Sequence, residues 1–486
     1  MKAIIVGGGT AGWVTLSYLA ATTDLDLTIM HSNEIDIIGV GESTTPALRH
    51  VAKTCGVDES SFMRDGKATW KFSIDFRDWM HKGSRWLHTF DDTQLVDNRI
   101  NSLDYFLRAR ELDPDNFGID TFNLAHGPYH YLIKHRLSTY SKDGKENLGH
   151  FQGPAYHVNA YEFGQSLRKN TNADRYTEIE ATIDRVEYDD NGIKELILKD
   201  GTSMTADIYI DCTGFHRVLS KGLTDFHPYK DMKNDRAIFG TVKGVTLDEP
   251  VTGAWAQDAG WIWNIPTYGQ VGSGHVYCGA YQTDQRAEDT IRDYWRQRGH
   301  EWTPTKKVEF TSGRLERIAT KNLITNGLGQ SFIEPLEATS IMVTCVTAMQ
   351  ISQQYNKHNT WNDKSSDVLN TVITRMLEET KDYVRCHYDL SNRTDSDYWN
   401  DCRRPEAIQE VCDYIDKTKR KPIYLNGFNW ISMLVGYEKP YLNETTKLDQ
   451  RLVDEYMREA LSAESRYEEM FSDNLTVLEK LDLINK

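Results

Sequence analysis

The sequence predicts an α/β protein whose N-terminal part forms a parallel sheet. Residues 1–6 are an apolar run of the length of a buried strand, residues 13–21 have helix-compatible composition, and residues 25–30 alternate like a second strand. A strand, a helix and a strand in this order form a βαβ unit, in which the strands are parallel and the crossover is right-handed. The strands of such a sheet are buried on both faces, which explains their apolar character.

Composition limits the class of protein. The 486 residues include 56 Lys or Arg and 72 Asp or Glu, which gives a formal net charge of −16. This acidic balance argues against nucleic acid as the main partner, because phosphate binding relies on dense Lys and Arg. No apolar run approaches the roughly 20 residues of a membrane helix, and the 7 scattered cysteines favour free thiols over disulfides or a metal site. We expect a soluble, cytoplasmic protein with no metal and no membrane contact.

The other elements are predicted in chain order. A Gly-rich turn at 38–43 precedes a helix that begins near Pro46, and Asp189-Asp190-Asn191-Gly192 is typical of a tight turn between two strands. Further strands are expected at 182–188, 193–199 and 208–210, a β-rich region at 237–282, helices at 341–357, 364–387 and 405–419, and an amphipathic tail at 446–484. Residues 91–170 show weak periodicity and carry no assignment.

The first chemical signal is the motif Gly7-x-Gly9-x-x-Gly12 at the end of the first strand. In dinucleotide-binding folds the first glycine makes a tight turn, the second lets the backbone approach a pyrophosphate, and the third lets the helix pack closely on the strand. The helix N-terminus adds free N–H groups and partial positive charge. With a strand before it and a helix after it, the motif predicts a dinucleotide site, the alternative being an ordinary glycine-rich turn.

One position departs from that pattern. An acidic residue is expected near the end of the second strand, where it holds the ribose hydroxyls. This chain has His31-Ser32-Asn33 at that place, and Glu34 and Asp36 come a little late. We therefore expect the contact to adenosine to be weaker or differently arranged.

Two further motifs place aromatic or acidic residues in apolar surroundings. Trp261 and Trp263 lie two residues apart in an expected strand and so point to the same face, the alternative being packing in a sheet core. Glu334 and Glu337 flank Pro335-Leu336 in an apolar stretch, where carboxylates are costly unless they are paired or functional. The alternative for Glu337 is stabilisation of a helix N-terminus.

Lys71 stands between Trp70 and Phe72, and the pattern is that of a half-buried residue. Most lysines are solvated surface groups, which is the alternative here. A desolvated lysine, however, has a lowered pKa and becomes a usable neutral amine.

Together these motifs resemble those of the flavin-dependent halogenases related to the tryptophan halogenases. The matching segments follow the family's order: GGGTAGW at 7–13, IGVGEST at 38–44, IDCTGF at 210–215, GWIWNIP at 260–266 and FIEPLEAT at 332–339. The resemblance implies a Rossmann-like FAD-binding domain of the flavin monooxygenase type with a β-rich substrate region, over residues 1–345. A mainly helical C-terminal region, residues 346–486, would close the substrate site.

The resemblance also implies a reaction and the residues that perform it. A separate flavin reductase would supply FAD as FADH2, with which the enzyme turns O2 and a halide ion into hypohalous acid for a small aromatic substrate, free or carrier-tethered. Lys71 would hold the activated halogen, and Glu337 would lie beside the substrate. The flavin contacts would be Gly7, Gly9, Thr10, Ala11, Gly12, Ser43 and Leu328, the halide would lie near Thr339 and Ser340, and Trp261, Trp263 and Pro266 would keep substrate and flavin apart.

Three departures from the family pattern bear on specificity. Ala338 replaces the usual Ser after the glutamate, and Ser340 replaces the usual Gly after the threonine. Both lie near the halide position that the resemblance implies, so we expect bromide or iodide to be preferred to chloride. The segment that clamps the amino acid in tryptophan halogenases is missing between 417–422 and 424–427. We therefore expect a phenol or indole derivative, and not free tryptophan, as the substrate.

Two other functions fit part of the pattern. A flavin-dependent monooxygenase would hydroxylate an aromatic with the same cofactor, and a non-catalytic flavin-binding scaffold would have no turnover. Lys71, Glu337 and the Trp261/Trp263 pair argue against the hydroxylase. The presence of both Lys71 and Glu337 argues against the scaffold.

Overall fold

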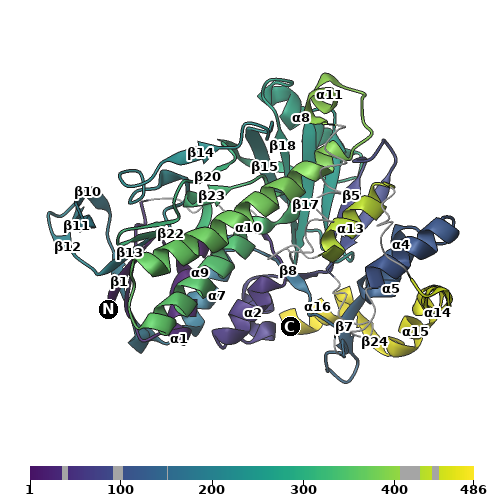
Figure 1. The fold of residues 1–486 in the computed structure, drawn as a ribbon, viewed down its shortest axis with the longest axis horizontal. Helices are drawn as coiled ribbons and strands as arrows, with labels where there is room; N and C mark the ends of the chain where they lie inside the picture. The colour runs from purple at the N-terminus through teal and green to yellow at the C-terminus, as the bar shows by residue number, and fades with distance from the viewer. Residues whose placement is uncertain (35–41, 91–101, 150, 405–426, 440–447) are drawn as a thin grey trace. The chain divides into compact units, whose positions relative to one another are not determined.

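The computed structural model describes residues 1–34, 42–90, 102–149, 151–404, 427–439 and 448–486. Figure 1 labels the helices and strands along the chain. The chain divides into two compact units, each assembled from three segments. The first unit comprises residues 1–68, 158–232 and 309–381, and the second comprises residues 69–157, 233–308 and 382–486. The functional division expected near residue 345 stays a prediction.

The first unit contains the expected parallel sheet, with strand order β21-β22-β13-β1-β2-β9. Its strands are β1 (Lys2–Val6), β2 (Asp26–His31), β9 (Tyr176–Glu180), β13 (Ile208–Asp211), β22 (Leu323–Thr325) and β21 (Ala319–Thr320). All neighbours are parallel except the edge pair β21 and β22. Ala3, Ile4 and Ile5 are completely buried, so the N-terminal apolar run is a buried strand, as predicted. It lies between β13 and β2 in the sheet.

Helix α1 (Thr10–Thr22) follows β1 and contacts both α7 (Ala160–Asn170) and α9 (Thr339–His358). Residues 12–20 of α1 are all buried, so this helix is covered on every side. The unit also contains α2 (Ala47–Thr54), α3 (Glu59–Asp65), β10 (Ile183–Asp189), β11 (Gly192–Leu198), β12 (Ser203–Met204), β14 (Phe226–Pro228), β20 (Gly313–Leu315) and β23 (Ser331–Phe332). Strands β10 and β11 confirm the predicted hairpin. Helix α10 (Asp363–Asp389) confirms the helix expected at 364–387.

The second unit is built on a seven-stranded sheet, with order β19-β15-β18-β17-β16-β5-β6. Its strands are β5 (Ser73–Arg77), β6 (Arg85–Thr89), β15 (Arg236–Lys243), β16 (Val251–Gln257), β17 (Gly260–Thr267), β18 (Gln270–Tyr277) and β19 (Thr303–Glu309). Helix α8 (Asp284–Arg296) packs on this sheet through a buried cluster that includes Ile262, Ile291 and Trp295. The short strands β4 (Thr69–Lys71) and β8 (Ala155–Val158) also pair in the antiparallel direction.

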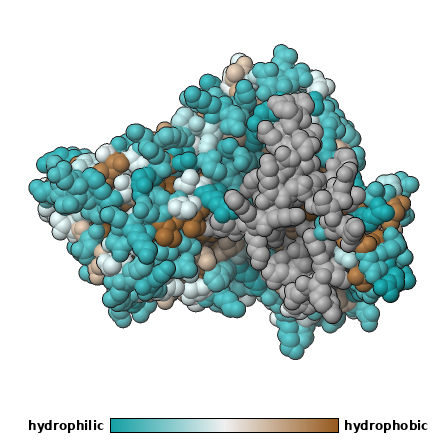
Figure 2. Space-filling view, in the orientation of Figure 1, coloured by the Kyte–Doolittle hydropathy of each residue, from teal (hydrophilic) through white to brown (hydrophobic). Residues whose placement is uncertain are grey.

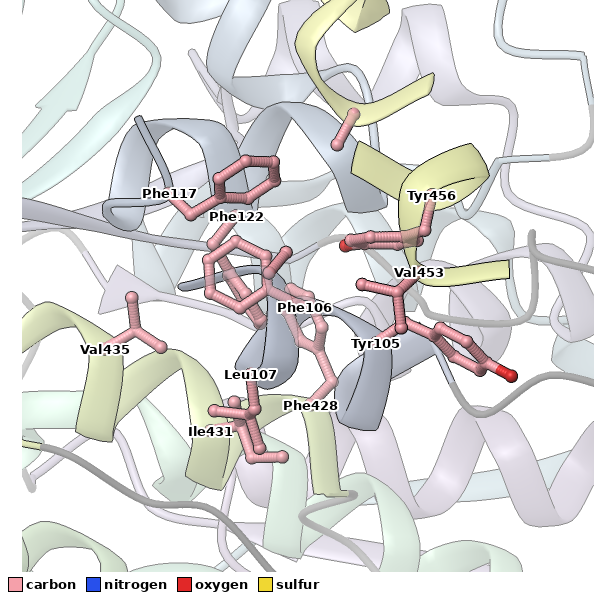
Figure 3. Packing of buried hydrophobic residues seen from close by; sticks show 12 residues of the cluster. Tyr105, Phe106, Leu107, Phe117, Phe122, Phe428, Ile431, Val435, Val453 and Tyr456 are labelled. Carbon is pink, nitrogen blue, oxygen red and sulfur yellow. The ribbon is translucent and has the colours of Figure 1, made fainter. Parts of the chain in front are cut away.

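Four helices of the second unit enclose another hydrophobic core (Figure 3). They are α4 (Ser102–Leu112), α5 (Ile119–His126), α13 (Gly427–Gly436) and α14 (Gln450–Leu461). The ring of Phe122 lies 4.8 Å from that of Phe106 and 5.1 Å from that of Phe428. The unit also includes α6 (Tyr129–His135), α11 (Asp397–Cys402), α15 (Ala463–Met470), α16 (Val477–Asn485), β7 (Leu137–Ser141) and β24 (Asn474–Thr476). The helix expected at 405–419 lies outside the described residues.

Hydrophilic residues dominate the described part of the surface shown in Figure 2. Large exposed apolar side chains, such as Leu112 and Leu483, belong to separate elements. No helix among the described residues has the length and apolar character needed to cross a membrane. Within the same residues, no three His, Cys, Asp or Glu side chains are grouped so that they could hold a metal ion.

Candidate active site

The glycine loop joins β1 to α1 in the first unit. Gly7 has a φ of +125°, which side chains rarely tolerate, and a Cβ there would overlap the carbonyl group of Cys212. A Cβ on Gly12 would overlap the carbonyl oxygen of Gly7. At Gly9, by contrast, a Cβ would meet no described atom within 4 Å. Of the three motif glycines, Gly7 and Gly12 therefore allow close packing, and Gly9 leaves open space where a ligand can approach.

The N-terminus of α1 suits a pyrophosphate. Gly9 precedes the helix and offers no side chain to cap it, and the first turn contains no acidic residue. Thr10 turns its hydroxyl to the carbonyl oxygen of Ala160, at 3.4 Å. Because the first N–H groups of a helix have no partner within it, those of Thr10, Ala11 and Gly12 can bind an anion. This open, uncapped turn fits a diphosphate group.

The turn that carries Leu328 packs against the same helix. Leu328 is half-buried in the short 3-10 helix η4 (Gly327–Gly329). Gly327 has a φ of +77°, and a Cβ there would lie 2.5 Å from the Cβ of Ala11. The predicted flavin contacts Ala11 and Leu328 are therefore brought to neighbouring turns by the fold.

Asn326 holds three elements of this region together. Its Nδ2 group donates to the hydroxyl of Thr15 in α1 at 2.9 Å and to the carbonyl oxygen of Thr344 in α9 at 3.1 Å. The side chain is completely buried. Sequence reasoning missed this residue, because its partners lie 311 and 18 positions away and no local pattern marks them.

Glu337 and the expected halide positions lie at the start of α9. Glu337 ends the 3-10 helix η5 (Pro335–Glu337) and is 5% exposed. Ala338 then adopts the left-handed conformation, with a φ of 55°. Thr339 and Ser340 begin α9, whose first turn has no side-chain cap and no acidic residue. A helix N-terminus of this kind favours an anion close to its N–H groups.

Lys71 is the last residue of β4 in the second unit, opposite Ala155 of β8. The residue is completely buried, and its Nζ lies 4.7 Å above the centre of the Phe90 ring. The alternative of a solvated surface lysine is therefore wrong. The amine is therefore shielded from water and lies against an aromatic face.

His157 in β8 connects two hydroxyl groups near Lys71. Its Nδ1 lies 3.1 Å from Thr69 Oγ1, and its Nε2 lies 2.9 Å from Thr252 Oγ1. Thr69 donates its own proton to the carbonyl oxygen of Pro266 at 2.6 Å, so Nδ1–H donates to Thr69 and Nε2 accepts from Thr252. Burial, and after it the charge of Lys71, hold the pKa of His157 well below its ordinary value. The neutral ring keeps a second positive charge away from Lys71.

Trp261 and Trp263 lie in β17, which is buried along its whole length. Their ring centres are 6.2 Å apart, in keeping with two side chains on one face of a strand. Trp263 fills the space opposite Gly274, where a Cβ would overlap its ring. Trp261 packs 6.3 Å from Trp79, and its buried Nε1 has no hydrogen-bond partner among the described residues. Both tryptophans are therefore packed in the interior of the second unit.

The predicted residues fall into two groups. The first unit contains the glycine loop, Ser43, Leu328, Glu337, Thr339 and Ser340. The second unit contains Lys71, Trp261, Trp263 and Pro266. Ser43 ends the short strand β3 (Glu42–Ser43). Burial raises the pKa of the neighbouring Glu42 to about 7. Residues 38–41 of the Gly-rich turn lie outside the described residues.

The sequence profile that defines the tryptophan halogenases matches residues 2–448. The chain belongs to the tryptophan halogenase family. It is 29% identical over 472 residues to the tryptophan 6-halogenase SttH of Streptomyces toxytricini, covering 90% of this chain and 89% of that protein. The 7-chloro-L-tryptophan 6-halogenase KtzR of Kutzneria sp. (strain 744) is 30% identical over 438 residues, covering 84% and 83% of the two chains.

The fold of this chain is also similar to that of a solved halogenase structure, and the match covers 100% of each chain. Tar14, a tryptophan C-6 flavin-dependent halogenase (chlorinase) from taromycin biosynthesis, matches with a TM-score of 0.88 and 27% identity. Membership of the tryptophan halogenase family confirms the predicted resemblance, the α/β fold and the enzyme class, a flavin-dependent oxidoreductase. The roles of single residues, the halide and the substrate stay predictions.

Proposed function

We propose that this protein halogenates an electron-rich aromatic of the phenol or indole type with FADH2 from a separate reductase, O2 and a halide ion. The observation that carries the proposal is the completely buried Lys71, whose Nζ lies over the ring of Phe90. Bound reduced FAD would supply the two electrons that turn O2 and a halide into hypohalous acid. The remaining steps fall to side chains of this chain.

Lys71 would hold the hypohalous acid, either by a hydrogen bond from Nζ or as a haloamine. Glu337 is 5% exposed, and its carboxylate would polarise the acid. In the substitution a carbon–halogen bond would form while the halogen–oxygen bond breaks. Glu337 would accept the proton that the ring carbon releases and pass it to the departing hydroxide, which leaves as water. A buried position suits both groups, since water would compete for the same hydrogen bonds and hypohalous acid would oxidise exposed thiols.

The cofactor would lie on the glycine loop of the first unit. The backbone at Gly7, Gly9 and Gly12 and the uncapped start of α1 fit its diphosphate. Thr10, Ala11, Ser43 and Leu328 would complete its contacts. The buried pair Trp261 and Trp263, with Pro266 on the same strand, would keep the aromatic substrate apart from the flavin.

Halide and substrate preference follow from the departures in sequence. Ser340 adds a side chain in the first turn of α9, where the halide would meet backbone N–H groups. Ala338 lacks a hydroxyl that could orient the activated halogen. We propose that bromide or iodide is preferred to chloride. The segment whose shortening argues against free tryptophan, residues 417–426, lies outside the described residues, so this part of the proposal is supported by sequence alone.

One assay separates the candidate functions. The purified protein is supplied with FAD, an NADH-dependent flavin reductase, and phenol, indole or tryptophan, with chloride, bromide, iodide or no added halide. Mass spectrometry that finds halogenated product in the presence of halide supports the proposal. Oxygenated product without halide would show a hydroxylase, and FAD binding without any product would show a scaffold. Efficient halogenation of free tryptophan would contradict the substrate proposal and leave the reaction class intact.

A further inference from the structure

His31 lies against the glycine loop, at the position where an acidic residue is expected. It is the last residue of β2, which pairs in parallel with β1. The N–H of Gly7 donates to the carbonyl oxygen of Met30 at 2.8 Å. A Cβ added to Gly8 would lie 2.6 Å from the Cβ of His31. The end of β2 and the glycine loop are therefore in direct contact, as in dinucleotide folds where this position holds the ribose.

Two charged residues of the first unit fix the orientation of the imidazole. Its Nε2 lies 2.8 Å from Glu178 Oε1. Arg168 binds the same carboxylate, with Nε 3.0 Å from Oε2 and Nη2 2.9 Å from Oε1. Because Glu178 can only accept, Nε2 carries the proton, and the Nδ1 of the neutral ring keeps a lone pair. Among the described residues Nδ1 has no hydrogen-bond partner, and the side chain is 18% exposed.

Of the two nearby acidic residues, Asp36 lies outside the described residues, and Glu34 binds other groups. Glu34 lies beyond the end of β2, with its Oε2 2.6 Å from Lys199 Nζ and 3.3 Å from Thr182 Oγ1. A carboxylate at position 31 would also stand next to Glu178 and repel it. A neutral acceptor avoids that repulsion and adds no negative charge close to a pyrophosphate.

We infer that His31 binds the adenosine of FAD, with Nδ1 accepting a hydrogen bond from the ribose 2′-hydroxyl in place of the usual carboxylate. Glu178 is the positioning residue that sets the tautomer, and Arg168 holds Glu178. The inference rests on the proposed function for the identity of the cofactor. It concerns binding alone, so it can be tested without turnover.

Two substitutions separate the hydrogen-bond acceptor of His31, Nδ1, from the contact of its Nε2 with Glu178. In His31→Gln the side-chain amide can reach Glu178 from the place of Nε2, but the acceptor at Nδ1 is lost. In His31→Asn the amide group stands at the place of Nδ1, so an acceptor is kept while the contact to Glu178 is lost. His227→Gln is the matched control, because His227 forms a surface pair with Glu316 at 3.8 Å in the same unit. Thermal unfolding of each variant checks that the fold is unchanged.

The readout is the Kd for FAD, with ADP and 2′-deoxy-ADP as competitors. We expect His31→Gln to raise the Kd for FAD about 3- to 10-fold, the effect of one hydrogen bond, and His31→Asn to raise it less. The wild-type protein should prefer ADP to 2′-deoxy-ADP, and His31→Gln should not. An unchanged Kd or an unchanged preference in a folded His31→Gln variant would overturn the inference and leave the cofactor assignment intact. Failure of the wild-type protein to bind FAD would overturn both.

Discussion

Thr69 donates a hydrogen bond of 2.6 Å to the carbonyl oxygen of Pro266, although 197 positions separate the two residues. The bond joins β4, which ends at Lys71, to β17, which carries Trp261 and Trp263. Thr69 and Lys71 are alternate residues of β4 and so lie on the same face. This buried contact therefore fixes the strand that carries the proposed halogen-binding amine against the strand that carries the tryptophan pair.

Replacing Thr69 with valine tests this connection. The substitution keeps the shape of the side chain but leaves the Pro266 carbonyl and the Nδ1–H of His157 unpaired in a buried place. We expect a loss of about 1–3 kcal/mol in the free energy of unfolding, measured by denaturant titration. Thr69→Ser keeps the hydroxyl and is the control. Equal stability of the two variants would show that the hydrogen bond does not hold the strands together.

Lys71→Met should separate halogenation from flavin oxidation. Methionine preserves a long apolar side chain next to Phe90 but has no amine for the activated halogen. We expect the rate of aromatic halogenation to fall by about 100-fold or more, while oxidation of FADH2 continues. Lys145→Met, at a side chain that is 83% exposed in the same unit, should change neither rate. Halogenation that persists in Lys71→Met after free hypohalous acid is scavenged would contradict the role of the amine.

Local sequence predicts the parts of this fold whose determinants are local. The run 1–31 gives a strand, a glycine turn, a helix and a strand, because each depends on nearby periodicity and on Gly7 and Gly12. The aromatic neighbours of Lys71 predict a half-buried side chain, whereas the residue is completely buried. The secondary structure of residues 91–170 could not be predicted from local sequence. The short helices α4 and α5 in this range pack against Phe428 and Tyr456, which lie more than 300 positions away. Asn326 and His157 were missed for the same reason.

The stability of the protein should fall as the pH falls from about 6.5 to 4. Burial lowers the pKa of His275 to about 4, and its Nδ1–H donates to the carbonyl oxygen of Ala287 at 3.1 Å. The unfolded chain, with an ordinary pKa of 6.5 at this residue, binds a proton that the folded chain excludes. The contribution of His275 to the free energy of unfolding is therefore fully present above pH 6.5. It falls by about 3 kcal/mol as the pH approaches 4.

His275→Asn isolates that contribution. The variant can keep the hydrogen bond to Ala287 but cannot titrate. The slope of the unfolding free energy against pH is proportional to the number of protons taken up on unfolding. Between pH 6.5 and 4.5 we expect this number to be smaller by about one proton in the variant. The exposed His227→Gln control should leave the slope as it is. If His275→Asn and the wild-type protein had the same slope, protonation of His275 would not contribute to acid unfolding.

The glycines of the loop should respond differently to alanine. A Cβ at Gly9 meets no described atom within 4 Å, whereas one at Gly12 overlaps the carbonyl oxygen of Gly7. We expect Gly9→Ala to fold normally and to bind FAD more weakly, and Gly9→Trp to fold but not to bind it. Gly12→Ala should lower the melting temperature, because the helix can no longer pack closely on the strand. Flavin fluorescence titration and thermal unfolding measure the two effects, and unchanged FAD affinity in a folded Gly9→Trp variant would remove the loop from the site.

The start of α9 should set the preference between halides. Ser340 places a hydroxymethyl group in the first turn, and Ala338 turns the chain in the left-handed conformation without offering a hydroxyl. A larger and more easily oxidised halide should tolerate this altered site better than chloride. At equal concentrations we therefore expect brominated product to exceed chlorinated product on an indole or phenol.

The variant Ala338→Ser/Ser340→Gly should shift the bromide-to-chloride product ratio towards chloride by roughly 3- to 10-fold, which corresponds to the free energy of about one hydrogen bond. Ser472→Gly, at an exposed position in the C-terminal part of the chain, serves as the control. A wild-type protein that favours chloride, or a double variant with an unchanged ratio, would show that these two residues do not determine the halide.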